Sequence, residues 1–277
     1  MAVGQRHVDC ALHCLTRGFD GPEWPCVCVR DDRRWYLDRR RCHDRYRRHG
    51  CAAVTEAETL QPTRLLVVRH GESNVTVNRQ IGGPLTCTGL SDLGRQQAER
   101  LRDRVAAGEL STIDEVWAST MPRARETAEI INQAIGHELQ LDQEFEEFRP
   151  GDADGMTFSD YVEQYGMIDQ MAEPYKDLSP GGESRSTFFL RVGRAFDDLV
   201  RSRPGKTLMV VCHGGVIDVV FRRLLNLHSE AAFQLWTTNT SVSEFITTSH
   251  GPPRQWRLGR YNDASHLYGL PSATNTH

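Results

Sequence analysis

The feature that most constrains the fold is a pair of short, continuous apolar runs, each of which ends on a histidine and a glycine. Residues 64–71 read RLLVVRHG, and residues 207–214 read TLMVVCHG. A strand without polar alternation must be covered on both faces, which is typical of parallel sheets with helices on either side. We therefore expect both runs to be buried strands, and we expect ligands at their carboxyl ends, where open α/β sheets bind them.

Strand-like runs alternate with helical periodicity from residue 54 onward. The predicted strands are 64–69, 113–118, 207–212, 242–247 and 256–261, and the predicted helices are 91–107, 122–135, 157–165, 183–202 and 215–226. This alternation implies a mainly parallel sheet covered on both faces. The predicted fold is therefore α/β, a three-layer α/β/α sandwich, with an N-terminal extension that has no clear structure.

The extension, residues 1–53, differs in composition from the remainder. It holds six of the eight cysteines, and its 11 arginines and 7 acidic residues give a net charge of +4, which leaves −8 for the rest of the chain. Cys10 and Cys14 have a spacing that zinc ligands use, although no second well-spaced pair accompanies them. A basic nucleic-acid-binding arm is a second hypothesis, which the interspersed acids weaken. We favour a third: a disordered tail, or a start codon assigned too early, before a domain at 54–277.

The bulk composition is that of an ordinary globular protein, with 39% hydrophobic and 25% charged residues. No stretch approaches the roughly 18 apolar residues of a membrane span. The N-terminus also lacks the apolar core of a signal peptide. We therefore expect a cytoplasmic protein that acts on neither membranes nor nucleic acids, while the sequence does not indicate its oligomeric state.

Charged and titratable residues follow the predicted strands. Arg69 and His70 follow the first apolar run, Arg123 follows the strand at 113–118, and His213 and Gly214 follow the second apolar run. Guanidinium groups match phosphoryl oxygens in a bidentate manner, and glycines before a helix let the backbone approach an anion. Each residue taken alone suits a structural role, but together they indicate a phosphate site.

Five motifs occur in an order that resembles the histidine phosphatase superfamily, in its phosphoglycerate mutase-like branch. These motifs are LLVVRHGES, SxxxRARETA, EFRPGDADG, SPGGES and VVCHGG, within residues 63–265. The resemblance implies that His70 is the nucleophile and forms a phosphohistidine. It also implies that Arg69, Arg123 and a protonated His213 hold the phosphoryl group, with no cofactor and no metal ion.

The acid of the family pattern E-x-x-x-G-x-x-[ED]-G falls on Glu147, which the resemblance makes the general acid and base. Glu146 is one position out of register, and we expect it to be a surface neighbour. One departure concerns the residue that usually follows RHGES after two positions, an asparagine that contacts phosphate. Thr76 occupies that position, with Asn74 and Asn78 on either side. Because a hydroxyl can donate one hydrogen bond, we retain Thr76 as a phosphate-binding candidate.

The resemblance leaves three functions open. A phosphoglycerate mutase would carry an arginine directly after its general acid, whereas Phe148 stands there. Phe148 lies within residues 142–154, an acidic segment that should repel polyanions. We therefore favour a phosphatase, a phosphomonoesterase that hydrolyses a small phosphorylated metabolite through phosphohistidine. The alternatives are mutase-type phosphoryl transfer and a non-catalytic member that binds a phosphorylated ligand.

Overall fold

The computed structural model describes residues 28–31, 34–37, 61–228, 233, 235–248 and 255–271, and for the first two ranges it describes the backbone alone. The chain divides into two units, Met1–Thr59 and Leu60–His277. In the first unit, β1 (Cys28–Asp31) pairs with β2 (Arg34–Leu37) as an antiparallel ribbon. The side chains on which the zinc, nucleic-acid and tail hypotheses depend lie outside the described residues.

The second unit is built on a six-stranded sheet whose strand order is β5-β4-β6-β3-β7-β8. The strands are β3 (Thr63–Arg69), β4 (Glu115–Ser119), β5 (Leu139–Asp142), β6 (Thr207–Cys212), β7 (Val242–Thr247) and β8 (Arg257–Asp263). The pairs β4–β5, β4–β6 and β3–β6 are parallel, while β7 is antiparallel to both of its neighbours. The prediction of a mainly parallel sheet is therefore confirmed.

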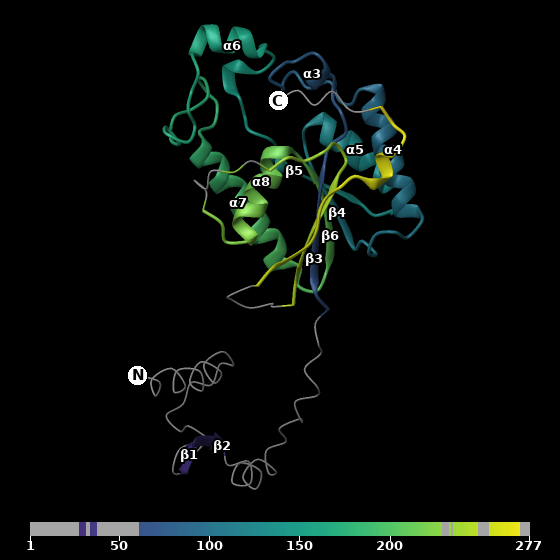
Figure 1. Cartoon of the computed structure of the whole chain (residues 1–277), viewed down its shortest axis with the longest axis vertical. Coiled ribbons are helices and arrows are strands. Elements are labelled where there is room, and N and C mark those ends of the chain that lie inside the picture. The colour runs from purple at the N-terminus through teal and green to yellow at the C-terminus, as the bar shows by residue number, and fades with distance from the viewer. Residues whose placement is uncertain are drawn as a thin grey trace. The chain divides into compact units, whose positions relative to one another are not determined.

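Helices cover both faces of this sheet (Figure 1). They are α3 (Asn74–Val77), α4 (Asp92–Ala106), α5 (Pro122–Asn132), α6 (Phe158–Tyr165), α7 (Arg185–Ser202) and α8 (Gly214–Leu224). Successive residues of β3 point to opposite faces: Leu65 and Val67 belong to the core under α7 and α8, and Leu66 and Val68 belong to the core under α4 and α5. This double burial explains the unbroken apolar run and confirms the three-layer prediction.

The N-termini of several helices follow from capping residues. The side chain of Ser91 accepts a hydrogen bond from the amide of Gly94 at the start of α4. At the start of α7, Ser184 and Thr187 form a reciprocal capping box. Pro122 occupies the first turn of α5, where a missing amide proton costs nothing. These capping residues determine where each of the three helices begins.

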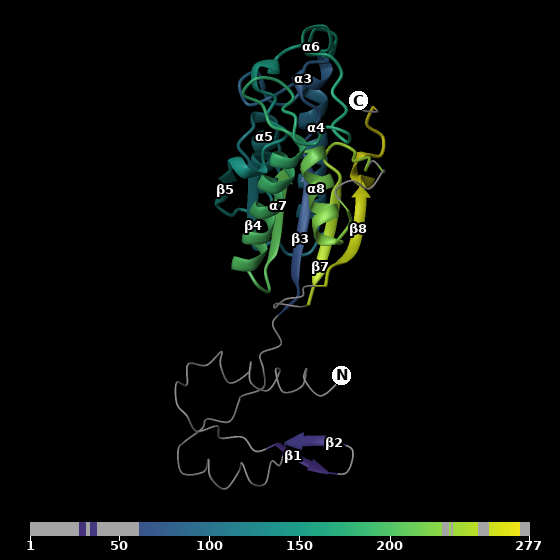
Figure 2. The same ribbon diagram turned by 90° about the vertical axis from the view of Figure 1, so that its left-hand side faces the viewer.

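Among the described strands and α-helices of the second unit, two were not predicted. β5 is a four-residue edge strand whose side chains are only partly covered, so it shows no apolar run. α3 is a single turn directly after the RHGES motif. Together with α6, α3 lies beyond the end of the sheet at which β3 terminates (Figure 2). None of the helices among the described residues combines the length and the apolar composition needed to cross a membrane.

Candidate active site

The site lies where the neighbouring strands β3 and β6 end. Because the strands pair in parallel with Arg69 opposite Cys212, His70 and His213 follow at the same level. Their ring centroids are 5.1 Å apart, and the rings meet at an angle of 61°. Both side chains are buried, with exposed fractions of 5% and 0%. Residues that are 143 positions apart in sequence (213 minus 70) are thus in direct proximity.

The hydrogen bonds of His70 fix the tautomer of its ring. Nδ1 lies 2.6 Å from the carbonyl oxygen of Gly71, which can only accept, so Nδ1 carries the proton. Nε2 accepts a hydrogen bond of 3.1 Å from Nε of Arg123. Burial, and then the positive charges of Arg123 and Arg69, hold the pKa of His70 well below its ordinary value. The ring is therefore neutral at neutral pH, with its lone pair on Nε2.

Arg123 comes from the first turn of α5 and is itself buried, with 4% exposed. Besides the bond to His70, its Nη1 donates to the carbonyl oxygen of Gly82 at 3.0 Å. The loop that contains Gly82 is in turn fixed by Asp154, whose carboxylate accepts from the amides of Gly83 and Leu85. Arg123 therefore connects the histidine to a loop that is anchored from a different part of the chain.

Two buried polar atoms at the site have no hydrogen-bond partner among the described residues: Nε of Arg69 and Nδ1 of His213. Arg69 uses another nitrogen, Nη1, to donate to the carbonyl oxygen of Thr237. Burial lowers the pKa of Arg69, an effect that Glu147 opposes and Arg123 reinforces. Since buried polar atoms in proteins are nearly always hydrogen-bonded, the two unpartnered nitrogens are suited to a polar ligand.

Ser119, the last residue of β4, is the hydrogen-bond partner of His213. Its Oγ accepts from the amide of Met121 and lies 2.8 Å from Nε2 of His213. When the hydroxyl donates to Nε2, the ring proton lies on Nδ1, the nitrogen that has no partner among the described residues. Burial, followed by Arg123 and His70, holds the pKa of His213 well below its ordinary value. This direction favours a neutral ring in the ligand-free site, whereas a protonated His213 beside a bound phosphoryl group remains a prediction.

The carboxylate of Glu147 lies at the start of α8, near Arg69. Its Oε2 accepts from the amide of Gly215 at 2.9 Å, at the start of α8, and its Oε1 accepts from the amide of Phe148. A Cβ on residue 215 would lie 2.4 Å from Oε1, so a side chain there would displace the carboxylate from this position. At Gly214, the first residue of α8, a Cβ would make ordinary contact with Nε of Arg69 at 3.8 Å. The motif register therefore selected the glutamate that faces α8.

Glu146 is not the surface neighbour that we expected. Its exposed fraction is 8%, and its carboxylate binds the Thr120 hydroxyl and Nε of Arg149. We expected exposure because Glu146 does not fall on the acid of the family motif. That expectation was wrong, because the Glu146 side chain points back toward the end of β4. It ties the acidic segment to the sheet.

Thr76, the threonine at the family's asparagine position, lies within α3 and is partly buried. Its Oγ1 bonds to Oγ of Ser73 at 2.9 Å. Among the described residues, this is the hydrogen bond that its side chain makes, so the structure does not bring Thr76 into the histidine cluster. Its candidacy for phosphate binding remains a prediction.

Sequence reasoning missed a polar loop before β7. Nδ2 of Asn239 donates to the carbonyl oxygen of His70, and the amide of Thr240 donates to that of Arg69. Thr240 has a φ of 54°, which is unusual for a β-branched residue. Its Oγ1 lies 2.9 Å from Nε2 of His266. The only available signal was the position of this polar stretch between a helix and a strand, and such stretches are common.

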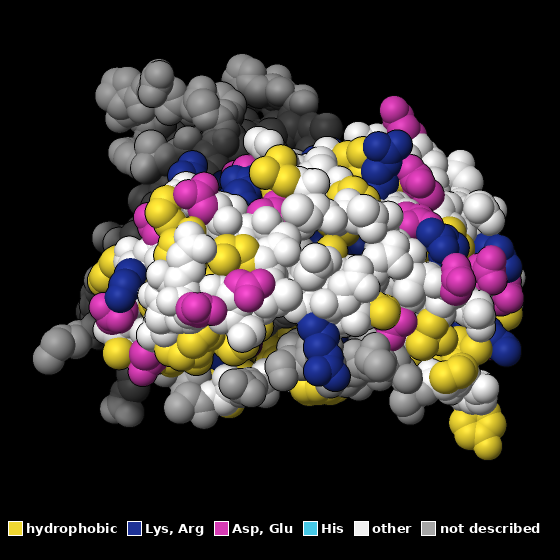
Figure 3. Space-filling model, turned by 90° about the horizontal axis from the view of Figure 1, so that it is seen from above, with side chains coloured by type: hydrophobic (Ala, Val, Ile, Leu, Met, Phe, Trp, Pro, Cys, Tyr) yellow, Lys and Arg dark blue, Asp and Glu magenta, His cyan; other side chains and the backbone are white. Residues whose placement is uncertain are grey.

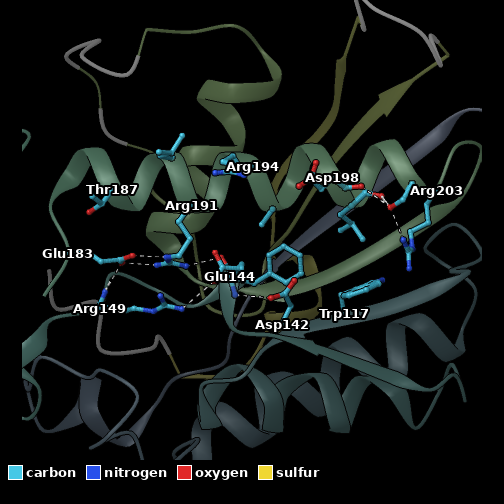
Figure 4. A pocket seen from close by; sticks show the side chains of 15 residues that line it. Trp117, Asp142, Glu144, Arg149, Glu183, Thr187, Arg191, Arg194, Asp198 and Arg203 are labelled. Atoms are coloured by element: carbon cyan, nitrogen blue, oxygen red, sulfur yellow. Dashed lines mark hydrogen bonds and ion pairs between the residues drawn. The ribbon is translucent and has the colours of Figure 1, made fainter. Parts of the chain in front are cut away.

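The surface around α3 and α6 is mixed in character (Figure 3). Its exposed hydrophobic side chains come from residues 74–90 and 148–182, and they are Val77, Leu85, Phe158, Met167, Met171 and Tyr175. A groove of about 700 Å³ lies elsewhere, between α7 and the β4–β5 edge, and is lined by residues such as Trp117, Arg191 and Arg203 (Figure 4). It does not include either histidine. Within the described residues, no three His, Cys, Asp or Glu side chains are grouped so that they could hold a metal ion.

The chain is an α/β protein in which two histidines and two arginines gather at the strand ends, an arrangement suited to binding a phosphoryl group. The sequence comparisons agree with this class of protein. Residues 65–264 match the histidine phosphatase superfamily (branch 1), and the chain belongs to this family. It is 30% identical over 217 residues to phosphoglycerate mutase-like protein 4 of Arabidopsis thaliana, which covers 76% of this chain and 90% of that protein. The recognition made from the motifs is thereby confirmed.

Solved structures give the same result. The chain is similar to a mycobacterial glucosyl-3-phosphoglycerate phosphatase in complex with VO3, with 26% identity and a TM-score of 0.61 over 72% of this chain and 98% of that one. It is also similar to a phosphoserine phosphatase mutant from Entamoeba histolytica in complex with phosphoserine, with 25% identity and a TM-score of 0.61 over 74% and 99% of the two chains. The relatives therefore include both phosphatases and phosphoglycerate mutase-like proteins.

Proposed function

We propose that this protein is a phosphomonoesterase that hydrolyses a small phosphorylated metabolite through a phosphohistidine on Nε2 of His70. The observation that carries the proposal is the state of that ring. Its proton is held on Nδ1 by the Gly71 carbonyl, and burial together with the nearby arginines lowers its pKa and keeps it neutral. A neutral imidazole with a directed lone pair beside two guanidinium groups is the arrangement that attack on a phosphate monoester requires.

In the first step, Nε2 of His70 attacks phosphorus while the bond to the leaving oxygen breaks. Arg123 transfers its hydrogen bond from Nε2 to a phosphoryl oxygen, and the unpartnered nitrogens of Arg69 and His213 donate to the others. His213 acts as an Nδ1–H donor in this scheme. Glu147, protonated at the start of this step, gives its proton to the leaving alkoxide, so the products are an alcohol, a carboxylate and a phosphorylated histidine.

In the second step, water attacks phosphorus on the opposite side and the bond to Nε2 breaks. The Glu147 carboxylate takes a proton from the attacking water, which restores the carboxylic acid and releases inorganic phosphate. The positive charge that other phosphoryl-transfer enzymes obtain from Mg²⁺ comes here from Arg69 and Arg123. We therefore propose that turnover needs no metal ion and survives a strong chelator. Loss of activity on chelation, with recovery on adding Mg²⁺, would reject this part of the proposal.

The test of the nucleophile uses the full chain and a phosphate monoester labelled in the phosphoryl group. Rapid acid-free quenching should trap label on the wild-type protein as an alkali-stable, acid-labile adduct, and His70→Ala should abolish both the adduct and phosphate release. The control is His137→Ala, which alters an exposed histidine that bonds to the Ile113 carbonyl. Binding of phosphate esters without any turnover in the wild type would favour the non-catalytic alternative instead.

Mutase-type transfer is the second candidate, because relatives such as the probable phosphoglycerate mutase GpmB of Salmonella choleraesuis, 29% identical, carry that name. We expect conversion of 3-phosphoglycerate to 2-phosphoglycerate to be at least ~100-fold slower than hydrolysis, a difference of about 2.7 kcal/mol in barrier. One incubation with 3-phosphoglycerate and a catalytic amount of the bisphosphate measures both reactions. Isomer exchange that outruns phosphate release would replace the phosphatase proposal with the mutase.

A further inference from the structure

The side chain of Arg191, on α7, makes contacts that the proposed mechanism does not use. Its exposed fraction is 8%, and the guanidinium binds the Glu183 carboxylate with two parallel hydrogen bonds of 2.6 and 2.8 Å. The remaining three hydrogen bonds go to backbone carbonyl oxygens, those of Glu144, Glu146 and Glu147. An arginine has five N–H donors, so all of them are engaged.

The carbonyl oxygens of Glu146 and Glu147 belong to the two peptide units that flank the Cα atom of Glu147. Arg191 binds both of them, at 3.1 and 3.3 Å, from one rigid, planar group. Fixing the peptide planes on both sides of a Cα atom fixes its φ and ψ, and with them the direction of the Cα–Cβ bond. The orientation of the Glu147 side chain is therefore set at its base by Arg191.

The partner of Arg191 extends this control beyond Glu147. Oε2 of Glu183 also accepts from the amide of Arg149, and the Glu183 amide donates to the Arg149 carbonyl oxygen at 2.8 Å. The Phe148 ring, between these contacts, stacks on Phe188 of α7 with 4.8 Å between centroids. Figure 4 shows Arg191 reaching from α7 toward Glu183 on one side and the acidic segment on the other.

We infer that Arg191 and Glu183 are positioning residues that hold the general acid Glu147 in place for proton transfer to the leaving group, which deepens the proposed function and rests on it. The carboxylate of Glu147 is held at its tip by the amide of Gly215 on α8, and its backbone is held by α7. Such support matters because proton transfer requires the carboxyl group to lie within hydrogen-bond reach of the departing oxygen. Segment 143–150 has irregular backbone after its single 3₁₀ turn and cannot supply this precision by itself.

The test compares two substrates that differ in how much they need an acid. A p-nitrophenolate ion leaves readily without a proton, whereas phenolate leaves slowly unless it is protonated. With enzyme in excess over p-nitrophenyl phosphate or phenyl phosphate, the release of the phenol reports the first step alone. Arg191→Lys keeps a positive charge beside Glu183 but lacks the planar fork that binds the carbonyl groups.

We expect Arg191→Lys to slow phenol release by at least about tenfold, a part of the 10²–10⁴-fold that general acid catalysis contributes. The release of p-nitrophenol should change little. The matched control is Arg194→Lys, one turn further along α7, where the side chain is exposed; neither rate should change. Glu183→Gln removes the negative charge that faces Arg191 while keeping the size of the side chain, and it should give the same substrate-selective loss. It serves as the test if circular dichroism shows that Arg191→Lys does not fold.

Glu147→Gln separates failure of this inference from failure of the proposed function. It should slow phenol release by about 100-fold or more, with a much smaller effect on p-nitrophenol. If it shows no such selectivity, the assignment of Glu147 as the acid is wrong. If it does, but the Arg191 and Glu183 variants slow both substrates equally or neither, the positioning role is refuted. Adding Arg191→Lys to Glu147→Gln should cost no further phenol rate, since the two residues act as one unit.

Discussion

His266 makes the stability of this protein sensitive to mild acid. Its Nε2 bonds to Oγ1 of Thr240, whose own proton goes to the Asn239 carbonyl oxygen, so Nε2 must be the donor. Nδ1 is buried without a partner among the described residues. Burial, and then the charge of Arg104, lower the pKa of His266 to about 4 from an ordinary value of 6.5, and Asp263 only partly opposes them.

The sign follows from proton binding. Between the folded pKa and the unfolded pKa, the unfolded chain binds a proton at His266 that the folded protein does not, so the free energy of unfolding falls as the pH falls. The contribution is intact above 6.5, decreases toward pH 4 and levels off below it. At about pH 5 the linkage relation gives a loss of about 2 kcal/mol relative to about pH 7.5. This is a large share of the 5–15 kcal/mol typical of a domain.

The perturbation is His266→Gln, which can still donate to Thr240 but cannot titrate. Urea unfolding of both proteins at about pH 7.5 and about pH 5 gives four free energies of unfolding. We expect the loss between the two pH values to be smaller in the variant by about 1.5–2 kcal/mol. His70 and His213 titrate in both proteins, so their effects cancel in this comparison. Equal losses in the two proteins would refute the reasoning, because His266 would then bind protons equally well folded and unfolded.

Four further substitutions test other contacts of the site and of the helices around it. Arg123→Ala should lower kcat for a phosphate monoester on the order of 10³-fold, as with other charge-stabilising arginines in phosphoryl transfer, and a loss under about tenfold would place it outside the site. Gly94→Ala should lower the free energy of unfolding by about 2–3 kcal/mol, because a Cβ at this position would lie 2.0 Å from a backbone oxygen. Gly193→Ala should instead raise the free energy of unfolding by about 0.5–1 kcal/mol, because the nearest atom to its Cβ would lie 3.9 Å away. Denaturant unfolding distinguishes the two, and equal effects would contradict the packing account. Asp154→Asn should lower kcat/KM on the order of tenfold, because it weakens the hydrogen bonds that hold the loop at 83–86 beside Arg123. Steady-state kinetics measures this ratio, and an unchanged kcat/KM would contradict the prediction.

The sequence predicted those parts of the fold that depend on burial along a single segment. β3 and β6 were recognisable because central strands covered on both faces have no polar side to display. β5 was not, because an edge strand of four partly covered residues carries neither an apolar run nor a clear alternation. The hairpin of β1 and β2 likewise lies in a segment whose composition gave no periodic signal.

The candidate site divides in a similar way. Arg69, His70, Arg123 and His213 were chosen as candidates because each stands at or after the end of a predicted strand in an ordered motif. The residues that set their tautomers and backbone positions were not, because their contacts span long sequence separations. Asn239, for example, reaches the carbonyl oxygen of His70 across 169 positions. No local pattern distinguishes such a polar loop residue from any other.

The carboxylates of the acidic segment make contacts that their number in the sequence does not reveal. They were expected to repel a polyanionic substrate, yet most of them are engaged within the protein. Glu146 pairs with Arg149, Asp154 binds backbone amides, and Asp142 caps the 3₁₀ turn that follows it. A carboxylate paired with a guanidinium contributes little field at a distance because the two charges oppose each other, and this holds for Glu146 and Arg149. We therefore expect the choice between hydrolysis and transfer to depend also on local contacts at Glu147, where Phe148 packs against α7 and offers a leaving phosphoglycerate no positive charge to keep it bound.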